Sequence, residues 1–156
     1  MPTPLLVGHG LDSHRLADGR RLVLGGVTIP AARGAQAHSD GDVLLHALAD
    51  ALLSTAGLGD IGVHFPDDDG LWLDFDSAEM LGRVRVMLRE QGVTSIVNVA
   101  GVIVLDQPKL SPYRDAITHS VAALVELPIE RVGITFKTSE GLAPDHVQAS
   151  VTVMVR

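Results

Sequence analysis

AHSDGDVLLHALADALLSTAGLGDIGVHFPDDD, residues 37–69, is the stretch from which the fold and the site of this chain are most readily inferred. Solvation alone would favour Lys, Glu and Arg on the outer face of a soluble helix, and this stretch contains none of them. Its ionisable side chains are all His or Asp, the residue types that bind metal ions. The stretch therefore predicts a short apolar helix surrounded by candidate metal ligands.

The predicted helix covers residues 43–54. Ser39 or Asp40 is a suitable N-cap, and Gly57 is suited to end the helix. Leucine and alanine cover most of its circumference. A helix that is apolar on most sides is expected to be buried.

Three polar residues interrupt that apolar surface. Asp42, His46 and Asp50 recur every four residues, so they form one stripe along the helix. A buried histidine beside carboxylates is typical of a metal ligand whose second ring nitrogen is held by an acid, here Asp42 or Asp50. The alternative, a core histidine with aspartates as helix caps, stays open from this stretch alone. In either case we expect the stripe to face a cleft or a partner subunit.

A second pair of candidate ligands lies near the N-terminus. Residues 3–9 predict a first strand, and Asp12 and His14 follow its expected end. Residues two apart in extended chain point to the same side, so the carboxylate and the imidazole would lie together. Together with His46 they would supply the three N/O ligands of a catalytic zinc site. An ordinary polar loop is the alternative for this pair.

Composition limits the classes of function. The chain has 156 residues, 46% hydrophobic but only 3% aromatic, which suits one domain with an aliphatic core. It contains no cysteine, which excludes thiolate metal sites and suits a reducing cytoplasm. A net charge of −7 argues against nucleic acid as a partner, and no apolar run is long enough for a membrane span or a secretory signal. An anionic substrate would have to be met by metal ions, backbone amides and a few local cations.

The rest of the chain alternates between strand and helix patterns. Residues 21–29 predict a strand or hairpin arm with a bulge or turn at Gly25 and Gly26, and residues 30–36 and 57–69 predict loops. A capping-box motif at residues 76–79 begins a helix that ends at Gly92, and a further helix is predicted from Ser111 to before Pro128. Strands are predicted at 94–105, a run rich in β-branched residues, and at 131–137 and 147–155. The predicted order is β-β-α-α-β-α-β-β. We expect an α/β fold of the two-layer α+β kind, in which about three helices pack on one side of a mixed sheet, as a single domain over residues 1–156.

A second polar cluster follows the strand that ends near residue 137. Lys137 and the hydroxyls of Thr138 and Ser139 are suited to contact phosphate oxygens, and Glu140 suits a hard cation such as Mg²⁺. A polar turn is the alternative. The sequence has no phosphate-binding loop of the G-x-x-x-x-G-K-[ST] type, so a metal and phosphate site would have to be assembled from distant segments.

These motifs together resemble one enzyme family. Residues 8–14, GHGLDSH, and the stretch 37–69 are similar to the G-x-G-x-D-x-H and AHSDGDV…LGDIG-x-x-FPD motifs of 2-C-methyl-D-erythritol 2,4-cyclodiphosphate synthases. Residues 107–109 and 137–140 resemble the later nucleotide and phosphate loops of that family. The resemblance runs nearly end to end. It implies an enzyme of non-mevalonate isoprenoid synthesis that cyclises 4-diphosphocytidyl-2-C-methyl-D-erythritol 2-phosphate and releases CMP, as a homotrimer with a site at each subunit boundary.

The resemblance also implies roles for individual residues. Asp12, His14 and His46 correspond to zinc ligands, and Glu140 to the ligand of Mg²⁺ or Mn²⁺. His38 and Thr138 correspond to transition-state stabilisers. The implied substrate-binding residues are Ser39 beside His38, then Asp60, Ile61, Gly62, Phe65, Pro66, Asp67 and Asp69 around the methylerythritol part, Leu105, Asp106, Gln107, Pro108, Lys109 and Leu110 around the nucleotide, and Lys137 and Ser139 near the phosphates.

The chain departs from the family pattern after Glu140. Many members continue as LGFTGRGEGIA, whereas residues 141–146 here read GLAPDH, without the Phe and Arg. The resemblance therefore does not cover residues 141–146, and it implies no contact of this segment with the nucleotide or with an isoprenoid diphosphate at the trimer centre. Two other functions fit the same ligand set: a zinc phosphohydrolase that activates water, and a structural metal-binding trimer. Closed structural zinc sites favour four ligands, usually with cysteine, which argues against the structural alternative.

Overall fold

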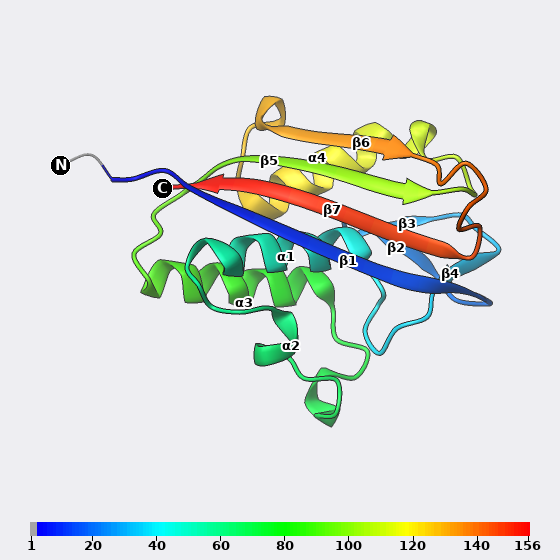
Figure 1. The fold of residues 1–156 in the computed structure, drawn as a ribbon, viewed down its shortest axis with the longest axis horizontal. Coiled ribbons are helices and arrows are strands. Elements are labelled where there is room, and N and C mark those ends of the chain that lie inside the picture. Colours follow the sequence, from blue (N-terminus) through cyan, green and yellow to red (C-terminus); the bar gives the residue numbers. More distant parts are fainter. Residues whose placement is uncertain (1–2) are drawn as a thin grey trace.

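The computed structural model describes residues 3–156, in which a curled mixed sheet is covered by helices on one face (Figure 1). The strands are β1 (Leu6–Asp18), β2 (Leu22–Leu24), β3 (Val27–Ile29), β4 (Arg33–Ala35), β5 (Ile96–Leu105), β6 (Val132–Lys137) and β7 (His146–Val155). The helices are α1 (Val43–Thr55), α2 (Ile61–His64), α3 (Ser77–Glu90) and α4 (Arg114–Val125), with short 3₁₀ turns η1 (Gly70–Trp72), η2 (Ser111–Tyr113) and η3 (Ile129–Arg131).

The main sheet has the strand order β4-β1-β7-β5-β6. Strand β1 pairs antiparallel with β4 and with β7, and β5 pairs antiparallel with β7 and parallel with β6. Strands β2 and β3 form a separate hairpin whose turn lies at Gly25 and Gly26. The chain therefore has the mixed sheet and α+β class that the sequence predicted.

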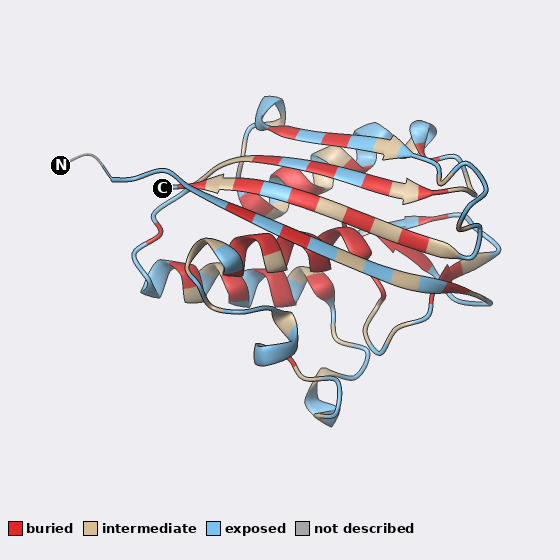
Figure 2. Ribbon diagram, in the orientation of Figure 1, coloured by how far each residue is buried: buried red, intermediate tan, exposed pale blue. Residues whose placement is uncertain are grey.

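The helices form the second layer. Helix α1 packs against β1 and β7, while α3 packs on α1 and α4 packs near β6. Figure 2 shows the burial of α1 and the alternation of buried and exposed residues along the strands. All residues of α1 from Val43 to Ala49 are buried, His46 among them. The predicted burial of this helix is therefore confirmed, and the core lies between it and the sheet.

Two glycines of β1 set the distance between the strand and α1. A Cβ atom at Gly8 would lie 1.9 Å from the carbonyl oxygen of Ala51, and one at Gly10 would lie 2.0 Å from that of Ala47. Neither distance is possible in a folded protein, so only glycine allows this approach of the two backbones. Because Asp12 and His14 follow on the same strand, this contact brings them to the level of His46.

Two predicted boundaries were wrong. Strand β1 does not end near His9 but continues to Asp18, because β7 pairs with it from Leu6 to Arg15. Asp12 and His14 therefore lie inside a strand, still on one side of it. The N-cap of α1 is Asp42 rather than Ser39 or Asp40, since the Asp42 carboxylate accepts the backbone N–H of Leu45.

Other parts agree with the sequence pattern. Asp76 caps α3 by accepting the N–H groups of Ala78 and Glu79, as its motif predicted. Strand β4 and helix α2 lie in segments that were predicted as loops, and each is four residues long or shorter. Among residues 3–156, the longest helices fall short of the length and apolar character that a bilayer crossing requires.

Candidate metal and phosphate site

Asp12 and His14 from β1 meet His46 from α1. Asp12 Oδ2 lies 2.9 Å from His14 Nε2 and 3.1 Å from His46 Nδ1. One ligand atom from each residue lies within 4.8 Å of the other two. The three donors that the sequence predicted therefore converge, although 34 residues separate Asp12 from His46.

The environment of these donors suits a divalent cation. His14 Nε2 is buried and, despite its closeness to Asp12, makes no well-directed hydrogen bond. Burial would raise the pKa of Asp12, but the contacts with His14 and His46 outweigh it and hold this pKa at about 2. Burial lowers the pKa of His46, but the Asp12 carboxylate outweighs that effect and raises it. One carboxylate and two imidazoles with a buried, unpartnered nitrogen are a donor set that fits zinc.

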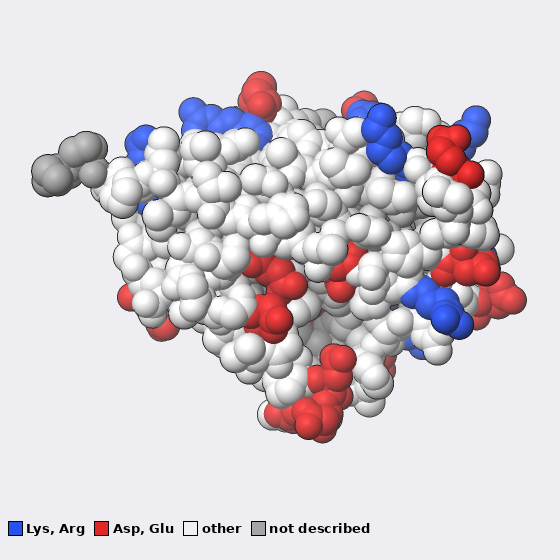
Figure 3. Space-filling model, in the orientation of Figure 1, with Lys and Arg blue, Asp and Glu red and all other residues white. Residues whose placement is uncertain are grey.

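A cavity of about 410 Å³ opens beside the three donors. His38 and Ser39 lie on its wall, and Phe65, Trp72 and Phe75 form an aromatic part of it. Phe65 and Trp72 meet edge to face with ring centroids 5.0 Å apart. Figure 3 shows acidic side chains gathered around a hollow below the sheet. The cavity therefore combines a polar floor with an apolar wall.

The residues predicted for the methylerythritol part divide into two groups. Ile61, Gly62, Phe65 and Asp67 line this cavity. The others shape the segment that carries them: Asp60 and Asp69 accept the N–H groups of Val63 and Leu71 as N-caps, and the carbonyl of Pro66 accepts the N–H of Asp69.

Asp42 and Asp50 do not hold the second nitrogen of His46, which corrects the prediction. The Asp42 carboxylate is fully buried and accepts the N–H groups of Gly25, Gly26 and Leu45. Asp50 accepts the N–H of Ile61 at 2.8 Å. Asp42 and Asp50 do lie on the same side of the helix as His46. Their carboxylates, however, accept from backbone N–H groups, most of which belong to other segments, and those donors cannot be identified from the local sequence.

His46 Nε2 instead contacts two serines. Ser77 Oγ lies 2.9 Å away and Ser39 Oγ 3.1 Å away. Ser77 is fully buried at the start of α3, where the sequence indicated only a helix N-terminus. Sequence reasoning missed this contact because a serine after a capping aspartate is ordinary at such a position.

The second polar cluster lies where β5 and β6 end. Both carboxylate oxygens of Asp106 are engaged by Ser139, at 2.6 Å from its backbone nitrogen and 2.8 Å from its hydroxyl. These bonds lower the pKa of Asp106. Thr138 Oγ1 donates to Glu140 Oε1 at 2.9 Å, and Glu140 adopts a left-handed backbone with φ of 56°. The loop after β6 is thus held against the loop after β5.

A cavity of about 180 Å³ lies beside this cluster. Of the predicted residues, it is lined by Leu105, Asp106, Lys109, Leu110, Lys137 and Thr138. Gln107, Pro108, Ser139 and Glu140 lie outside this lining. Arg114, whose guanidinium lies 4.7 Å from the ring centroid of Phe136, adds a cation that the sequence reasoning did not single out.

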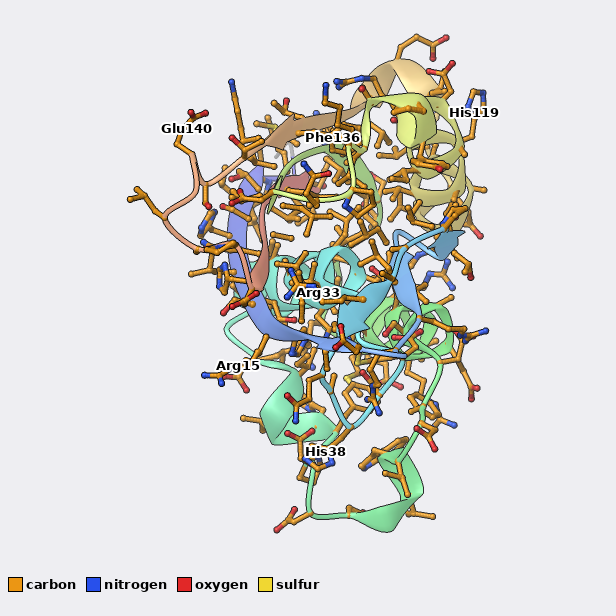
Figure 4. All side chains as sticks on the ribbon, turned by 90° about the vertical axis from the view of Figure 1, so that its right-hand side faces the viewer. Arg15, Arg33, His38, His119, Phe136 and Glu140 are labelled. Atoms are coloured by element: carbon orange, nitrogen blue, oxygen red, sulfur yellow. The ribbon has the colours of Figure 1, made fainter. Side chains whose placement is uncertain are left out.

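The two cavities are separate in one chain. They share no lining residue, and Figure 4 shows His38 and Glu140 far apart, at opposite ends of the molecule. His38 comes from the loop that enters α1, and Glu140 from the loop between β6 and β7. The two groups that the sequence assigned to one substrate therefore do not meet within a single copy of the chain.

Comparisons with known proteins agree with this architecture. A protein of Thermus thermophilus named 2-C-methyl-D-erythritol 2,4-cyclodiphosphate synthase is 52% identical over 149 residues, which are 96% of this chain and 97% of that protein. A solved structure of the same name has a TM-score of 0.92 at 50% identity, covering 96% of this chain and 99% of its own. Another, described as the form with bound CDP, has a TM-score of 0.91 at 49% identity and the same coverage. Because the YgbB family model also matches residues 5–156, the chain belongs to the YgbB family, together with these enzymes.

Proposed function

We propose that this chain cyclises 4-diphosphocytidyl-2-C-methyl-D-erythritol 2-phosphate to the 2,4-cyclodiphosphate and releases CMP. The family membership supports this activity, since the relatives bear the name of this synthase at 52% identity. The observation that carries the proposal for this chain is the convergence of Asp12, His14 and His46 beside a cavity. A related structure with bound CDP supports a cytidine nucleotide as part of the ligand.

The reaction joins two phosphate groups of one molecule. An oxygen of the 2-phosphate attacks the β-phosphorus, and the bond from that phosphorus to the CMP oxygen breaks, so no protein nucleophile is needed. Both groups are anionic, and bound divalent ions supply the neutralisation of charge that allows their approach. Asp12, His14 and His46 would hold zinc, while Glu140 would hold Mg²⁺ or Mn²⁺ together with phosphate oxygens.

The residues of the chain then act by position and hydrogen bonding. His38, in the wall of the larger cavity, and Thr138, beside the smaller one, stabilise charge on the phosphates as it moves. Ser39 lies beside the metal ligands in the larger cavity, and Lys137 lines the smaller cavity. In the proposed complex each contacts phosphate oxygens of the substrate. Holding the reacting groups in line is the main contribution of such a site.

The remaining substrate contacts divide between the two cavities. The segment of residues 60–69 encloses the methylerythritol part against the aromatic wall. The loop of residues 105–110 holds the cytidine nucleotide, with Ser139 fixing its geometry through Asp106. Arg114 adds positive charge where the acidic chain otherwise offers little for an anionic ligand.

The family resemblance implies a homotrimer, and the separation of the cavities supports sites that are shared between subunits. A substrate that contacts both groups must lie between two copies, because they are at opposite ends of one chain (Figure 4). The outer sheet face offers a surface for association, with Val7, Leu11 and Val102 exposed at 63%, 56% and 36%. Each copy, residues 1–156, would act as one synthase domain.

Product analysis tests the activity. The zinc-loaded chain is incubated with the cytidyl substrate and Mg²⁺, with and without a chelator, and the products are identified by mass spectrometry. We expect CMP and the cyclic diphosphate, with loss of both in chelator. Release of linear phosphorylated products would instead support a phosphohydrolase. Asp12→Asn is expected to remove activity, while Asp18→Asn, a carboxylate at the exposed end of the same strand, serves as its matched control.

Sedimentation velocity tests the assembly. A trimer mass is expected at micromolar concentration, and Leu11→Lys, which places a charge on the exposed apolar face, is expected to shift the distribution toward monomer. A monomeric wild-type chain that retains full turnover would contradict the shared site.

A further inference from the structure

Both ring nitrogens of His46 are engaged, one on each side of the imidazole. Nδ1 lies 3.1 Å from Asp12 Oδ2, on the side of the candidate metal position. Nε2 lies 2.9 Å from the hydroxyl of Ser77, on the opposite side. Ser77 has no exposed surface and His46 only 6%, so water does not compete for these contacts. Without a cation, the Asp12 carboxylate favours a proton on Nδ1, because a carboxylate only accepts. With a cation on that side, the groups around Ser77 decide whether Nε2 carries the proton.

The direction of each hydrogen bond follows from the chemistry of Asp40. A carboxylate only accepts, so the contact between Ser77 Oγ and Asp40 Oδ1 uses the serine hydrogen. Asp40 is fixed for this role, because its Oδ2 also accepts the backbone N–H of Ser77 at 3.0 Å and its Oδ1 that of Asp42 at 3.1 Å. With its hydrogen used, the Ser77 oxygen is an acceptor toward His46.

The second neighbour of Nε2 agrees with this direction. Ser39 Oγ lies 3.1 Å from His46 Nε2 and accepts the backbone N–H of Gly41 at 3.2 Å. Accepting from Gly41 leaves this hydroxyl a second lone pair that can also accept from Nε2. The acceptor with a fixed direction is the Ser77 oxygen, which favours a proton on that nitrogen.

We propose that Ser77 and Asp40 are positioning residues that accept a proton on Nε2 of His46 and so leave the lone pair of Nδ1 to a cation at the metal position beside Asp12 and His14. The inference rests on the metal site of the proposed function. The three groups come from the loop after β4, from α1 and from the first residue of α3, so the network also locks the ring orientation. Removing the group that hydrogen-bonds the non-ligating nitrogen of a metal-ligating histidine typically weakens metal binding by roughly 10- to 100-fold.

The zinc affinity of the metal-free chain of residues 1–156, measured by competition with a fluorescent chelator, tests the proposal. Ser77→Ala is expected to weaken zinc binding by roughly 10-fold or more. Ser120→Ala is the matched control, because it removes a partly buried serine that donates to the carbonyl of Gly25 and lies away from the metal ligands. The control is expected to bind zinc as the wild type does, even where both variants lose stability.

Asp40→Asn provides a second variant that keeps the shape of the network. The amide can no longer accept from both the hydroxyl and the backbone N–H of Ser77, so the serine is freed to donate to Nε2. We expect weaker zinc binding than in the wild type. In ¹⁵N NMR of the zinc-loaded wild type, His46 is expected to show a protonated Nε2 and a ligating Nδ1.

The outcomes separate this inference from the proposed function. Zinc affinity of both variants equal to that of the Ser120→Ala control would overturn the positioning role, while the metal site itself would stand. A ligating Nε2 on His46 would also overturn it. A wild-type chain that binds no zinc would refute the metal site, and the inference with it.

Discussion

Substitution of Gly10 by alanine tests the contact that assembles the metal site. A Cβ at this position would lie 2.0 Å from the carbonyl oxygen of Ala47 and 2.6 Å from the backbone nitrogen of Ala51. Ordinary carbon–oxygen contact needs about 3.3 Å, so β1 and α1 would have to separate locally by roughly 1 Å. Both obstacles are backbone atoms of a buried helix, which cannot move alone.

The consequence is both structural and functional. Overpacking of this kind costs about 1–3 kcal/mol of stability, and the rigid partners here place the expected loss at about 3 kcal/mol. The same separation would move Asp12 and His14 away from His46, whose Nδ1 now lies 3.1 Å from Asp12. We therefore expect zinc affinity to fall by at least 10-fold, beyond any effect of lower stability.

Urea unfolding and zinc competition are the assays. Gly133→Ala is the matched control, since a Cβ at this glycine in β6 would have no neighbour within 4 Å. It should unfold within about 0.5 kcal/mol of the wild type. If Gly10→Ala matched this control in both urea midpoint and zinc affinity, the argument that glycine sets the spacing of strand and helix would be refuted.

Three further predictions concern single side chains. His46→Ala is expected to abolish turnover and tight zinc binding while far-UV circular dichroism stays native-like; wild-type activity would remove the zinc assignment. Burial raises the pKa of Asp42 to about 6 against the lowering effect of its N–H donors, so the folded state binds this proton more tightly than the unfolded state, whose carboxyl has a pKa of about 4. The free energy of unfolding should therefore fall by about 2–3 kcal/mol between pH 4 and pH 7 in the wild type relative to Asp42→Asn, and parallel pH profiles would contradict this. Asp76→Ala should lower the unfolding free energy by about 1 kcal/mol through loss of the α3 cap, with zinc affinity unchanged, as measured by urea unfolding and chelator competition.

Much of the fold could be predicted because its signals are local. The apolar circumference of α1 predicted a buried helix, and the Asp76 motif predicted the start of α3. The β-branched run ending at Leu105 predicted β5. The predicted end of β1 was wrong because of a partner distant in the sequence. β1 is longer than its own residues indicate because β7 pairs with it from Leu6 to Arg15.

The candidate site divides in the same way. Asp12, His14 and His46 were identifiable from residue type and spacing, because few other functions require His and Asp without Lys or Glu. The groups that contact Nε2 of His46, the ring nitrogen facing away from the candidate metal position, could not be identified from the sequence. Asp42 accepts from backbone N–H groups, and Ser77 contacts His46, because the fold places these partners next to them. Ser77 is 31 residues from His46 in the chain, so no local pattern indicates their contact.

The sequence by itself determined the donors: two imidazoles and a carboxylate at set places, a helix apolar enough to be buried, and a strand with glycine where another backbone must pass. Only the tertiary structure decided that these donors share one position, that a serine and an aspartate flank the far side of His46, and that the Glu140 loop lies at the other end of the molecule. The physical reason is that residue type and local backbone preference are properties of neighbouring residues. Convergence is a property of the packing between β1 and α1, and it depends on contacts between residues tens of positions apart.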